Sequence, residues 1–438
     1  MAHRESGTEG ESERLRPAAQ SGRIRRAPGA VPLPPRFDAF DPSLHRDPYP
    51  AYARLREAAP VCRGGPGQWV VTRYAEVAAL LRDPRLGQFQ PDAFNLFPGA
   101  LSASLGDGPV TSFLRTIIAG RDRPEHSRLR RLTAKLLTQD LAARIRSRIG
   151  DLVDELIAPG IERGSLDAVA ELAVPVPLTL MSELLGIPPA DREEVGRQAL
   201  KLARIFSPVV SEVDRDAADR AITWLRDYFG QLLDGDDGDD EQGSGQAELL
   251  AGIRAGRLQG LVDAGEAVDN AIFVLFAGFE TSMNLLATGC AQLARHPAAW
   301  SRLRADPSLV PTAVEEFLRY DAPTQLTGRI VLEPLDVGGR NVRQGRVLLL
   351  LLGSANRDER RFAQPDDLDV ARDPNPHLSF GGGIHYCVGA ALARAEAAAV
   401  FDRLIRRLAV WEPAGDAERE MSATLRAYER VPVTVRAL

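Results

Sequence analysis

The chain has 438 residues, of which 44% are hydrophobic and only 6% aromatic, and its formal net charge is −6. A negative balance argues against general nucleic-acid binding, and the length allows one large domain or about three average ones. The three cysteines, Cys62, Cys290 and Cys387, are odd in number and have no paired spacing. This argues against a disulfide framework and a zinc site, and it favours a reducing compartment.

Two polar segments are predicted to be disordered. Residues 1–31 form an arginine-rich tail, and residues 32–438 are expected to form a single domain. A docking role for the tail is the alternative. The acidic run Asp234–Glu241 lacks the alternating oxygen ligands and closing glutamate of a calcium-binding loop, so it is predicted to be a solvated linker.

No segment predicts a membrane attachment. The tail is not followed by an apolar region, so it lacks the pattern of a secretory signal. The longest apolar runs, Ala271–Ala277 and Val347–Leu352, are far too short to span a bilayer. We therefore expect a cytoplasmic protein.

Residue patterns predict a series of helices with a few strands. Gln68–Thr72 and Val347–Leu352 have the apolar, β-branched character of strands. Residues 83–120, rich in Gly and Pro, are predicted to form a long loop that is either functional or disordered. Asp122 is predicted to be the N-cap of the helix that follows it. Helical spacing of apolar residues predicts helices over residues 48–59, 73–81, 121–137, 140–163, 174–185, 191–206, 211–233, 265–295, 310–320 and 388–408.

The predicted helix at 265–295 is apolar on nearly all sides of its centre, which indicates burial. It nevertheless contains Ala-Gly-Phe-Glu-Thr-Ser at 277–282. A glycine there costs about 1 kcal/mol in helix propensity, and an uncompensated buried glutamate costs more. One explanation is a helix bend with a satisfied polar pair. The other is functional: Gly278 lets a planar ligand approach the backbone, while Thr281 and Glu280 supply a hydroxyl and a proton-relay acid.

Near the C-terminus, three consecutive glycines open a loop that ends at Cys387. Residues 380–389 read Phe-Gly-Gly-Gly-Ile-His-Tyr-Cys-Val-Gly and lead into the predicted helix at 388–408. Glycines permit positive φ, so the backbone can fold tightly around a neighbour. A cysteine at a helix N-terminus meets the positive end of the helix dipole, which favours the metal-binding thiolate. A free, buried cysteine is the alternative.

These ten residues resemble the haem-binding signature of the cytochrome P-450 family, Phe-Gly-x-Gly-x-His-x-Cys-x-Gly, at every fixed position. The resemblance implies a mainly α fold with smaller β-sheets (α+β), in which helices and a long central helix sandwich haem b. In this reading Cys387 is the axial ligand of the iron. Phe380, His385 and Gly389 are then cofactor-binding residues.

The predicted long helix matches a second family motif, Ala-Gly-x-Glu-Thr-Ser/Thr. The resemblance places Ala277 and Gly278 against the haem. It makes Thr281 and Glu280 the catalytic residues, which route protons to O2, the co-substrate.

Further residues are implied at the edge and behind the haem. His126 and Arg130 match the His-x-x-x-Arg pair that binds the propionates in this family, and Arg329 matches a further propionate-binding arginine. A buried Glu-x-x-Arg pair fixes the cysteine loop, which here is Glu316 and Arg319.

Arg372 is the candidate for an arginine that joins this Glu-x-x-Arg pair. Without the resemblance, such a pair would be interpreted as a solvated ion pair on a helix surface. The substrate pocket is expected to draw on four segments, although some of its candidates could be ordinary core residues. The candidates are Phe94, Leu96, Phe206, Val274, Thr324, Gln325 and Leu326.

The resemblance implies a monomeric monooxygenase that hydroxylates or epoxidises a small, largely lipophilic molecule in bacterial secondary metabolism. Its electrons would come from a ferredoxin or flavodoxin with its reductase. Alternatives are oxidative coupling, peroxygenase chemistry, or a catalytically silent haem protein that recruits a carrier or senses ligands. A basic dock for the electron donor is expected on arginines that flank the cysteine side, with a solvated face as the alternative: Arg128, Arg131, Arg394, Arg403, Arg406 and Arg407.

Overall fold

The described part of the chain is built mainly from α-helices, with small sheets at its margins. The computed structural model describes residues 36–39, 41–88, 108–206, 210–235, 247–420 and 422–438. The predicted tail at 1–31 and most of the predicted acidic linker lie outside these residues. The prediction of a mainly helical α+β fold is confirmed.

Each of the ten predicted helices is present, whereas α1, α5, α11, α13 and α15 were not predicted. The long predicted helix at 265–295 is α12, and the helix predicted at 310–320 has those bounds. The helices are α1 (Pro42–Arg46), α2 (Tyr49–Ala58), α3 (Tyr74–Leu80), α5 (Pro109–Thr116), α6 (Glu125–Leu136), α7 (Gln139–Arg163), α8 (Pro175–Leu184), α9 (Arg192–Ala203), α10 (Glu212–Asp234), α11 (Glu248–Leu258), α12 (Ala264–Arg295), α13 (Pro297–Ala305), α14 (Val310–Tyr320), α15 (Leu352–Ala355) and α16 (Ala390–Arg407).

The largest sheet has five strands in the order β1-β2-β8-β5-β3. β2 and β8 run parallel, and the other neighbouring pairs are antiparallel. The remaining strands form a three-stranded sheet, β4-β12-β9, and two hairpins, β6-β7 and β10-β11. The strands are β1 (Val61–Arg63), β2 (Gln68–Val71), β3 (Leu86–Gly87), β4 (Ser165–Asp167), β5 (Thr327–Val331), β6 (Leu335–Val337), β7 (Arg340–Val342), β8 (Val347–Leu350), β9 (Leu408–Pro413), β10 (Glu418–Arg419), β11 (Tyr428–Arg430) and β12 (Pro432–Ala437).

Helix α12 is the central element of the core. It begins with a capping box, in which Glu266 N donates to Asp263 Oδ1 at 2.8 Å and Asp263 N donates to Glu266 Oε2 at 3.2 Å. Among the described helices, it alone is long and apolar enough to cross a membrane, but 72% of its most apolar window is buried within the protein. That burial is typical of a core helix.

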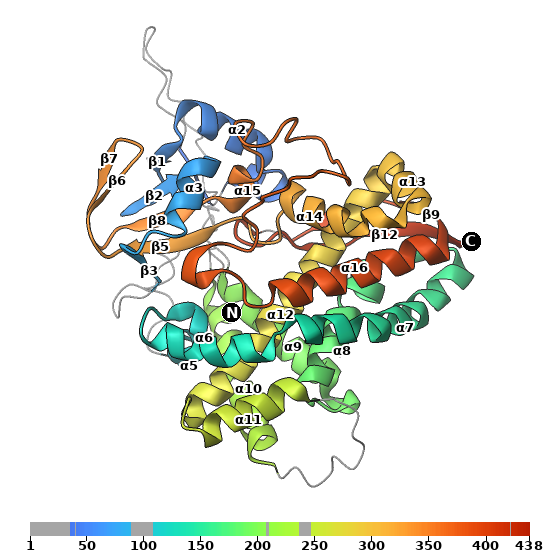
Figure 1. Ribbon diagram of the computed structural model, residues 1–438, viewed down its shortest axis with the longest axis horizontal. Coiled ribbons are helices and arrows are strands. Elements are labelled where there is room, and N and C mark those ends of the chain that lie inside the picture. Colours follow the sequence, from blue (N-terminus) through green and yellow to red (C-terminus); the bar gives the residue numbers. More distant parts are fainter. Residues whose placement is uncertain (1–35, 40, 89–107, 207–209, 236–246, 421) are drawn as a thin grey trace, which may run out of the picture. The chain divides into compact units, whose positions relative to one another are not determined.

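The helices around α12 place its middle opposite the cysteine loop. α8, α10, α14 and α16 pack against it, and α16 also lies along α7 (Figure 1). Phe317 of α14 and Phe401 of α16 meet edge to face, with ring centroids 5.0 Å apart. This contact joins α14 to α16, and both helices pack against α12.

Two local predictions were wrong. Residues 83–120 contain the helix α5, which begins at Pro109 and buries Val110, Phe113 and Leu114. Asp122 does not cap α6, because the helix begins only after Pro124 and the residue before a proline avoids the helical conformation. The Asp122 carboxylate accepts instead from the backbone N–H of Gln88 at 3.0 Å.

Candidate active site

The cysteine loop is fixed against the end of α3. It makes a tight turn over Gly383–His385, and Cys387 N donates to Phe380 O at 2.9 Å. Gly383 has a φ of +67°, and a Cβ added there would lie 2.4 Å from Leu81 O. Only glycine satisfies both constraints, so the loop sequence sets the path to Cys387.

Cys387 lies inside the fold, but its side chain is accessible because it faces a cavity of about 320 Å³. Burial raises the pKa of the thiol; the Gly389 backbone and the charges of Arg130 and Arg394 act in the opposite direction but offset only part of the rise. The backbone N–H at the helix N-terminus therefore favours the thiolate, as expected, but desolvation of the charged form outweighs it in the protein without a metal.

Residues from distant parts of the sequence line this cavity together with Cys387. Helix α12 forms a wall across from the loop, and all the predicted cofactor-binding residues are brought into this one space, together with the predicted catalytic residue Thr281. Besides Cys387, the cofactor-binding residues are Ala277 and Gly278 from α12, His126 and Arg130 from α6, Arg329 from β5, and Phe380, His385 and Gly389 from the loop.

Two histidines of this cavity are in contact with each other. The rings of His126 and His385 have centroids 4.4 Å apart. Burial, the neighbouring His385 and Arg130 lower the pKa of His126 to about 4, and burial also lowers the pKa of His385. His385 Nε2 has no hydrogen-bond partner among the described residues, and it lies 3.6 Å from Asp122 Oδ1.

Arg329 is a buried cation in the same cavity, with 5% of its surface exposed. Arg329 Nη1 donates to two neutral acceptors, Thr327 Oγ1 at 3.0 Å and Gly328 O at 2.7 Å. Burial lowers the pKa of Arg329 to about 10, although the charge of Asp122 opposes this. The cavity therefore holds basic groups whose charge is poorly compensated by the protein itself.

Behind the loop, Glu316 and Arg319 form a fully buried ion pair, with Arg319 Nε 2.8 Å from Glu316 Oε2. Arg372 Nε lies 3.2 Å from the same oxygen. The structure thus brings together the three residues predicted to act here. They fix the chain between α14 and the cysteine loop.

A second cavity of about 290 Å³ adjoins the first, because Ala277, Thr281, Thr324 and Arg329 line both. Its walls are largely apolar. They come from α5 and the turn after it, from α12, from β5 and from the segment before β11: Leu114, Ile117, Phe273, Phe276, Leu326, Ile330 and Leu425. The two cavities together offer a space with Cys387 at one end and apolar walls at the other.

The polar motif of α12 lies where the two cavities meet. Thr281 Oγ1 donates to Ala277 O at 2.6 Å. Glu280 lines the apolar cavity and is 4% exposed, and burial together with the charge of Glu420 raises its pKa to about 8. Glu280 therefore holds its proton at neutral pH.

Gly278 lines the first cavity, as predicted. A Cβ added there would lie 2.7 Å from Met181 Sδ of α8, so the glycine also allows α8 and α12 to pack closely. The approach of a planar ligand to this backbone stays a prediction.

The predicted substrate-pocket residues divide into three groups. Val274, Thr324 and Leu326 line the cavities as expected. Gln325 lines neither; it is 1% exposed, and its amide donates to Ala322 O at 2.8 Å, because the alternation of the chain turns it away from Thr324 and Leu326. Phe94 and Leu96 lie outside the described residues, and Phe206 ends a short helical turn without a described side chain.

The predicted basic docking surface has fewer unpaired arginines than the sequence suggests. Most of its arginines already pair with carboxylates of the chain, and Arg131 is the exposed exception among the described residues. The pairs are Arg128 with Glu266, Arg394 with Glu315, Arg403 and Arg407 with Asp154, and Arg406 with Asp402.

Comparison with known proteins decides the family. A model of the cytochrome P-450 family matches residues 254–428. The 6-deoxyerythronolide B hydroxylase of Saccharopolyspora erythraea is 34% identical over 410 residues, covering 90% of this chain and 98% of that enzyme. The chain belongs to the cytochrome P-450 family.

Solved structures agree with this assignment. CalO2 superposes with a TM-score of 0.83 at 32% identity, covering 92% of this chain and 99% of that chain. P450BioI, solved in complex with an acyl carrier protein ligated with hexadec-9Z-enoic acid, has a TM-score of 0.80 at 30% identity, covering 90% and 99%. The fold is therefore the cytochrome P-450 fold, and the protein is a haem-thiolate monooxygenase that uses haem b and O2.

The cavity at Cys387 fits haem b in its chemistry. A thiol faces the space, and Arg329 and His385 Nε2 are buried groups that the propionate carboxylates would satisfy. The apolar wall of α12 suits the porphyrin face. A metal cation beside Cys387 would also reverse the effect of burial on its pKa, since a coordinated thiol is deprotonated.

Sequence reasoning missed several cytochrome P-450 site residues. Leu114 and Ile117 were hidden in the supposed loop at 83–120, although Pro109 followed by apolar residues at helical spacing could have revealed α5. Thr424 and Leu425 reach the substrate side of the cavity from the C-terminal segment. No local pattern marks them, because the backbone bridge of Leu425 to Thr324 is a long-range contact.

Proposed function

We propose that this cytochrome P-450 hydroxylates or epoxidises a small, largely lipophilic molecule in bacterial secondary metabolism. The observation that carries the proposal is the apolar cavity beside Thr281, which adjoins the cavity that Cys387 faces. Aromatic and aliphatic walls bind apolar substrates through burial of their surface, and the few polar groups orient them. The similarity to an enzyme named 6-deoxyerythronolide B hydroxylase supports the same class of chemistry.

In this proposal Cys387 holds the haem iron through its thiolate, and His126, Arg130, Arg329 and His385 neutralise the propionates. The bound haem supplies oxygen activation, with the thiolate donating electron density that favours O–O cleavage. The chain's own contribution is to hold the loop rigid through Gly383 and the buried Glu316 pair. It also excludes water from the two cavities.

Thr281 and Glu280 are proposed to move protons. The Thr281 hydroxyl lies where the two cavities meet and donates to Ala277 O, so it is held toward the helix backbone. Glu280 keeps its proton at neutral pH, since its pKa is about 8, and it can therefore act as an acid. In this proposal a proton passed on by Glu280 is replaced from the side of Glu420 and Arg204, the charged groups that act on its pKa.

The electrons are proposed to come from a separate ferredoxin or flavodoxin with its reductase, because the sequence has no flavin, nicotinamide or iron–sulfur motif. We further propose a monomer in the cytoplasm. Oxidative coupling and peroxygenase chemistry remain the alternatives within this fold. A silent carrier-recruiting protein is the alternative of another class; the similarity to P450BioI supports recruitment of a carrier and does not bear on silence.

The test begins with the reduced, carbon-monoxide difference spectrum of the purified protein. A strongly red-shifted Soret band that is lost in Cys387→Ala supports the thiolate role. A screen of lipophilic compounds by spectral shift, followed by turnover with a surrogate ferredoxin and reductase, then identifies substrates. Compounds that bind without any oxidised product would favour the silent alternative.

A further inference from the structure

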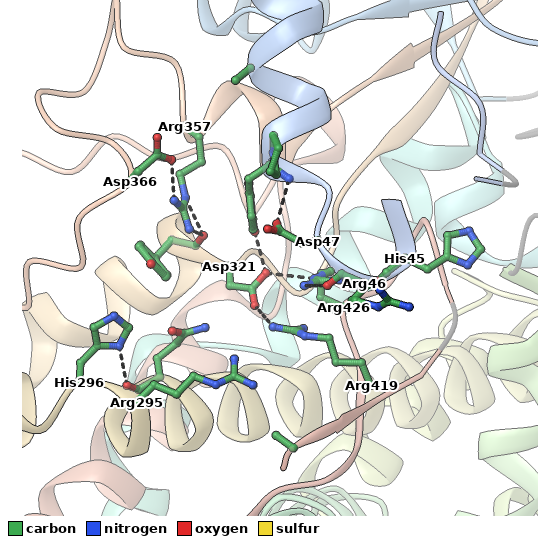
Figure 2. Close-up of a pocket in the computed structure, with 16 residues that line it drawn as sticks. His45, Arg46, Asp47, Arg295, His296, Asp321, Arg357, Asp366, Arg419 and Arg426 are labelled. Carbon is green, nitrogen blue, oxygen red and sulfur yellow. Dashed lines mark hydrogen bonds and ion pairs between the residues drawn. The ribbon is translucent and has the colours of Figure 1, made fainter. Parts of the chain in front are cut away.

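A separate cavity of about 860 Å³ lies outside the site described above. The ends of several elements form its walls: the first turn of α2, the C-terminal ends of α12 and α14, the loop after α15, and β10 (Figure 2). None of the residues that line it also lines the cavity that Cys387 faces or the apolar cavity beside Thr281. Nothing in the haem chemistry of the protein requires it.

Arginines dominate the polar lining of this cavity. Five arginines face three aspartates, an excess of two positive charges before two histidines are counted. Figure 2 shows that these side chains approach the space around Asp321 from several directions. The charged residues are Arg46, Arg295, Arg357, Arg419, Arg426, Asp47, Asp321 and Asp366.

The aspartates do not balance this charge. Asp321, which is 1% exposed, is shared by two cations, with Arg419 Nη2 at 2.6 Å and Arg426 Nε at 3.1 Å. Asp366 pairs with Arg357 at 2.7 Å, but its side chain is 72% exposed. A single buried carboxylate between two guanidinium groups leaves one positive charge in the wall of the cavity.

Three guanidinium groups keep donors for a ligand. Arg419 Nη1 is buried and has no hydrogen-bond partner among the described residues. Arg295 is exposed and donates to Tyr428 Oη at 3.1 Å, but it pairs with no described carboxylate. Arg46 is exposed, and its guanidinium has no described partner. A buried donor without a partner costs free energy, which an anion would recover.

We propose that this cavity binds a small organic polyanion, a molecule with two or more phosphate or carboxylate groups. Guanidinium forks pair with both kinds of group, often through two parallel hydrogen bonds. The volume is in the range of about 300–1,000 Å³ typical of small-molecule sites, so it exceeds the needs of one inorganic ion. The rings of His296 and Tyr320, with centroids 6.0 Å apart, line the cavity and offer apolar contact to the organic part.

The polyanion site shares a wall with the substrate cavity but remains distinct from it. Arg426 N donates to Pro323 O at 2.8 Å, and Gln325 N donates to Thr424 O at 2.8 Å. The segment 424–426 therefore lies between the two cavities: Arg426 lines the polyanion cavity, and Thr424 lines the apolar cavity beside Thr281. The proposal therefore does not depend on which substrate the enzyme oxidises.

Calorimetry on the haem-loaded protein tests the site, with pyrophosphate, citrate and inorganic phosphate as probes at constant ionic strength. The wild type should bind pyrophosphate or citrate at one saturable site, and more tightly than phosphate; the better of the two identifies the kind of anion. The double variant Arg46→Glu/Arg295→Glu should weaken that binding about tenfold or more. The control Arg340→Glu/Arg343→Glu, the same charge change at the exposed β6–β7 hairpin, should not.

Three outcomes would overturn the proposal: no saturable binding of pyrophosphate or citrate, equal weakening in both double variants, or phosphate binding as tightly as the polyanions. Carbon monoxide on the reduced haem should leave pyrophosphate binding unchanged; competition would place the anion in the haem cavity instead and would also overturn the proposal. The carbon-monoxide spectrum of each variant reports its folding. If the glutamate variants misfold, Arg46→Gln/Arg295→Gln makes the same test without charge reversal.

Discussion

The buried pair of Glu316 and Arg319 offers the sharpest test of how the cysteine loop is held. Both side chains are 0% exposed. The Glu316 carboxylate accepts from Arg319 Nε and Nη2, each at 2.8 Å, and from Asp369 N at 2.9 Å. It also accepts from Asn375 Nδ2 at 3.1 Å, close to the start of the loop. One carboxylate therefore joins α14 to the chain that leads to Cys387.

We expect Glu316→Gln to destabilise the fold by about 3–5 kcal/mol, the usual cost of removing one partner from a buried ion pair. The substitution keeps the size of the side chain, but it leaves the Arg319 charge with carbonyl acceptors only, such as Asn356 O and Pro365 O. The amide nitrogen of glutamine would also face donors. The urea midpoint of the haem-loaded protein should fall clearly, with a loss of the red-shifted carbon-monoxide band as the loop loosens.

The chain contains its own control for this experiment. Glu194 and Arg197 on α9 form a second Glu-x-x-Arg ion pair with the same spacing, but their side chains are 37% and 57% exposed. Glu194→Gln should leave the urea midpoint and the carbon-monoxide band unchanged, because solvent screens such a pair. If Glu316→Gln lowered the urea midpoint no more than Glu194→Gln does, burial would not explain the importance of the Glu316–Arg319 pair.

Two further changes test the site. The pKa of Glu280 is about 8 in the folded protein, whereas its ordinary value is 4.5. Between these two pH values Glu280 is therefore protonated in the folded state and ionised in the unfolded state. Stability should therefore fall as pH rises from about 5 to 8, and Glu280→Gln should reduce this slope of the urea midpoint; Glu396, also with a pKa of about 8, retains its own share. The same pH dependence of the urea midpoint in the wild type and in Glu280→Gln would contradict this. Gly383→Ala should lower the haem-to-protein absorbance ratio, because its Cβ would lie 2.4 Å from Leu81 O, whereas Gly339→Ala, at a φ of +74° with open space around it, should not.

The helices could be predicted from sequence because their signals are local. Val310–Tyr320 has proline in its first turn and apolar residues at helical spacing, and α14 has those bounds. The Glu-x-x-Arg pattern is different. It occurs at 194–197 as a solvated pair and at 316–319 as a buried one, and nothing in four residues distinguishes them. Only the resemblance of the whole chain to a family made the right choice.

Sequence reasoning fell short where packing decides the structure. Gly278 was expected to make room for a planar ligand, and the sequence does not show that it also makes room for Met181 of α8. The place of Cys387 before a helix favours the thiolate, but the sequence does not show the desolvation by the surrounding fold that raises the pKa of its thiol. Both outcomes depend on residues far away in the sequence. Gln325 is a local error, because the alternation of an extended chain separates it from its neighbours.

The pKa shifts around the first cavity suggest what its charges are for. Burial moves His126, His385 and Arg329 toward their uncharged forms, and it moves Cys387 toward the neutral thiol. An apolar substrate would strengthen all of these shifts, because it brings no charge and excludes water. A ligand with two carboxylates and a metal cation reverses them together, since the carboxylates favour the cations and the metal favours the thiolate. The residues that enclose the cavity are therefore matched to the cofactor, and substrate selection is left to the apolar walls beyond Thr281.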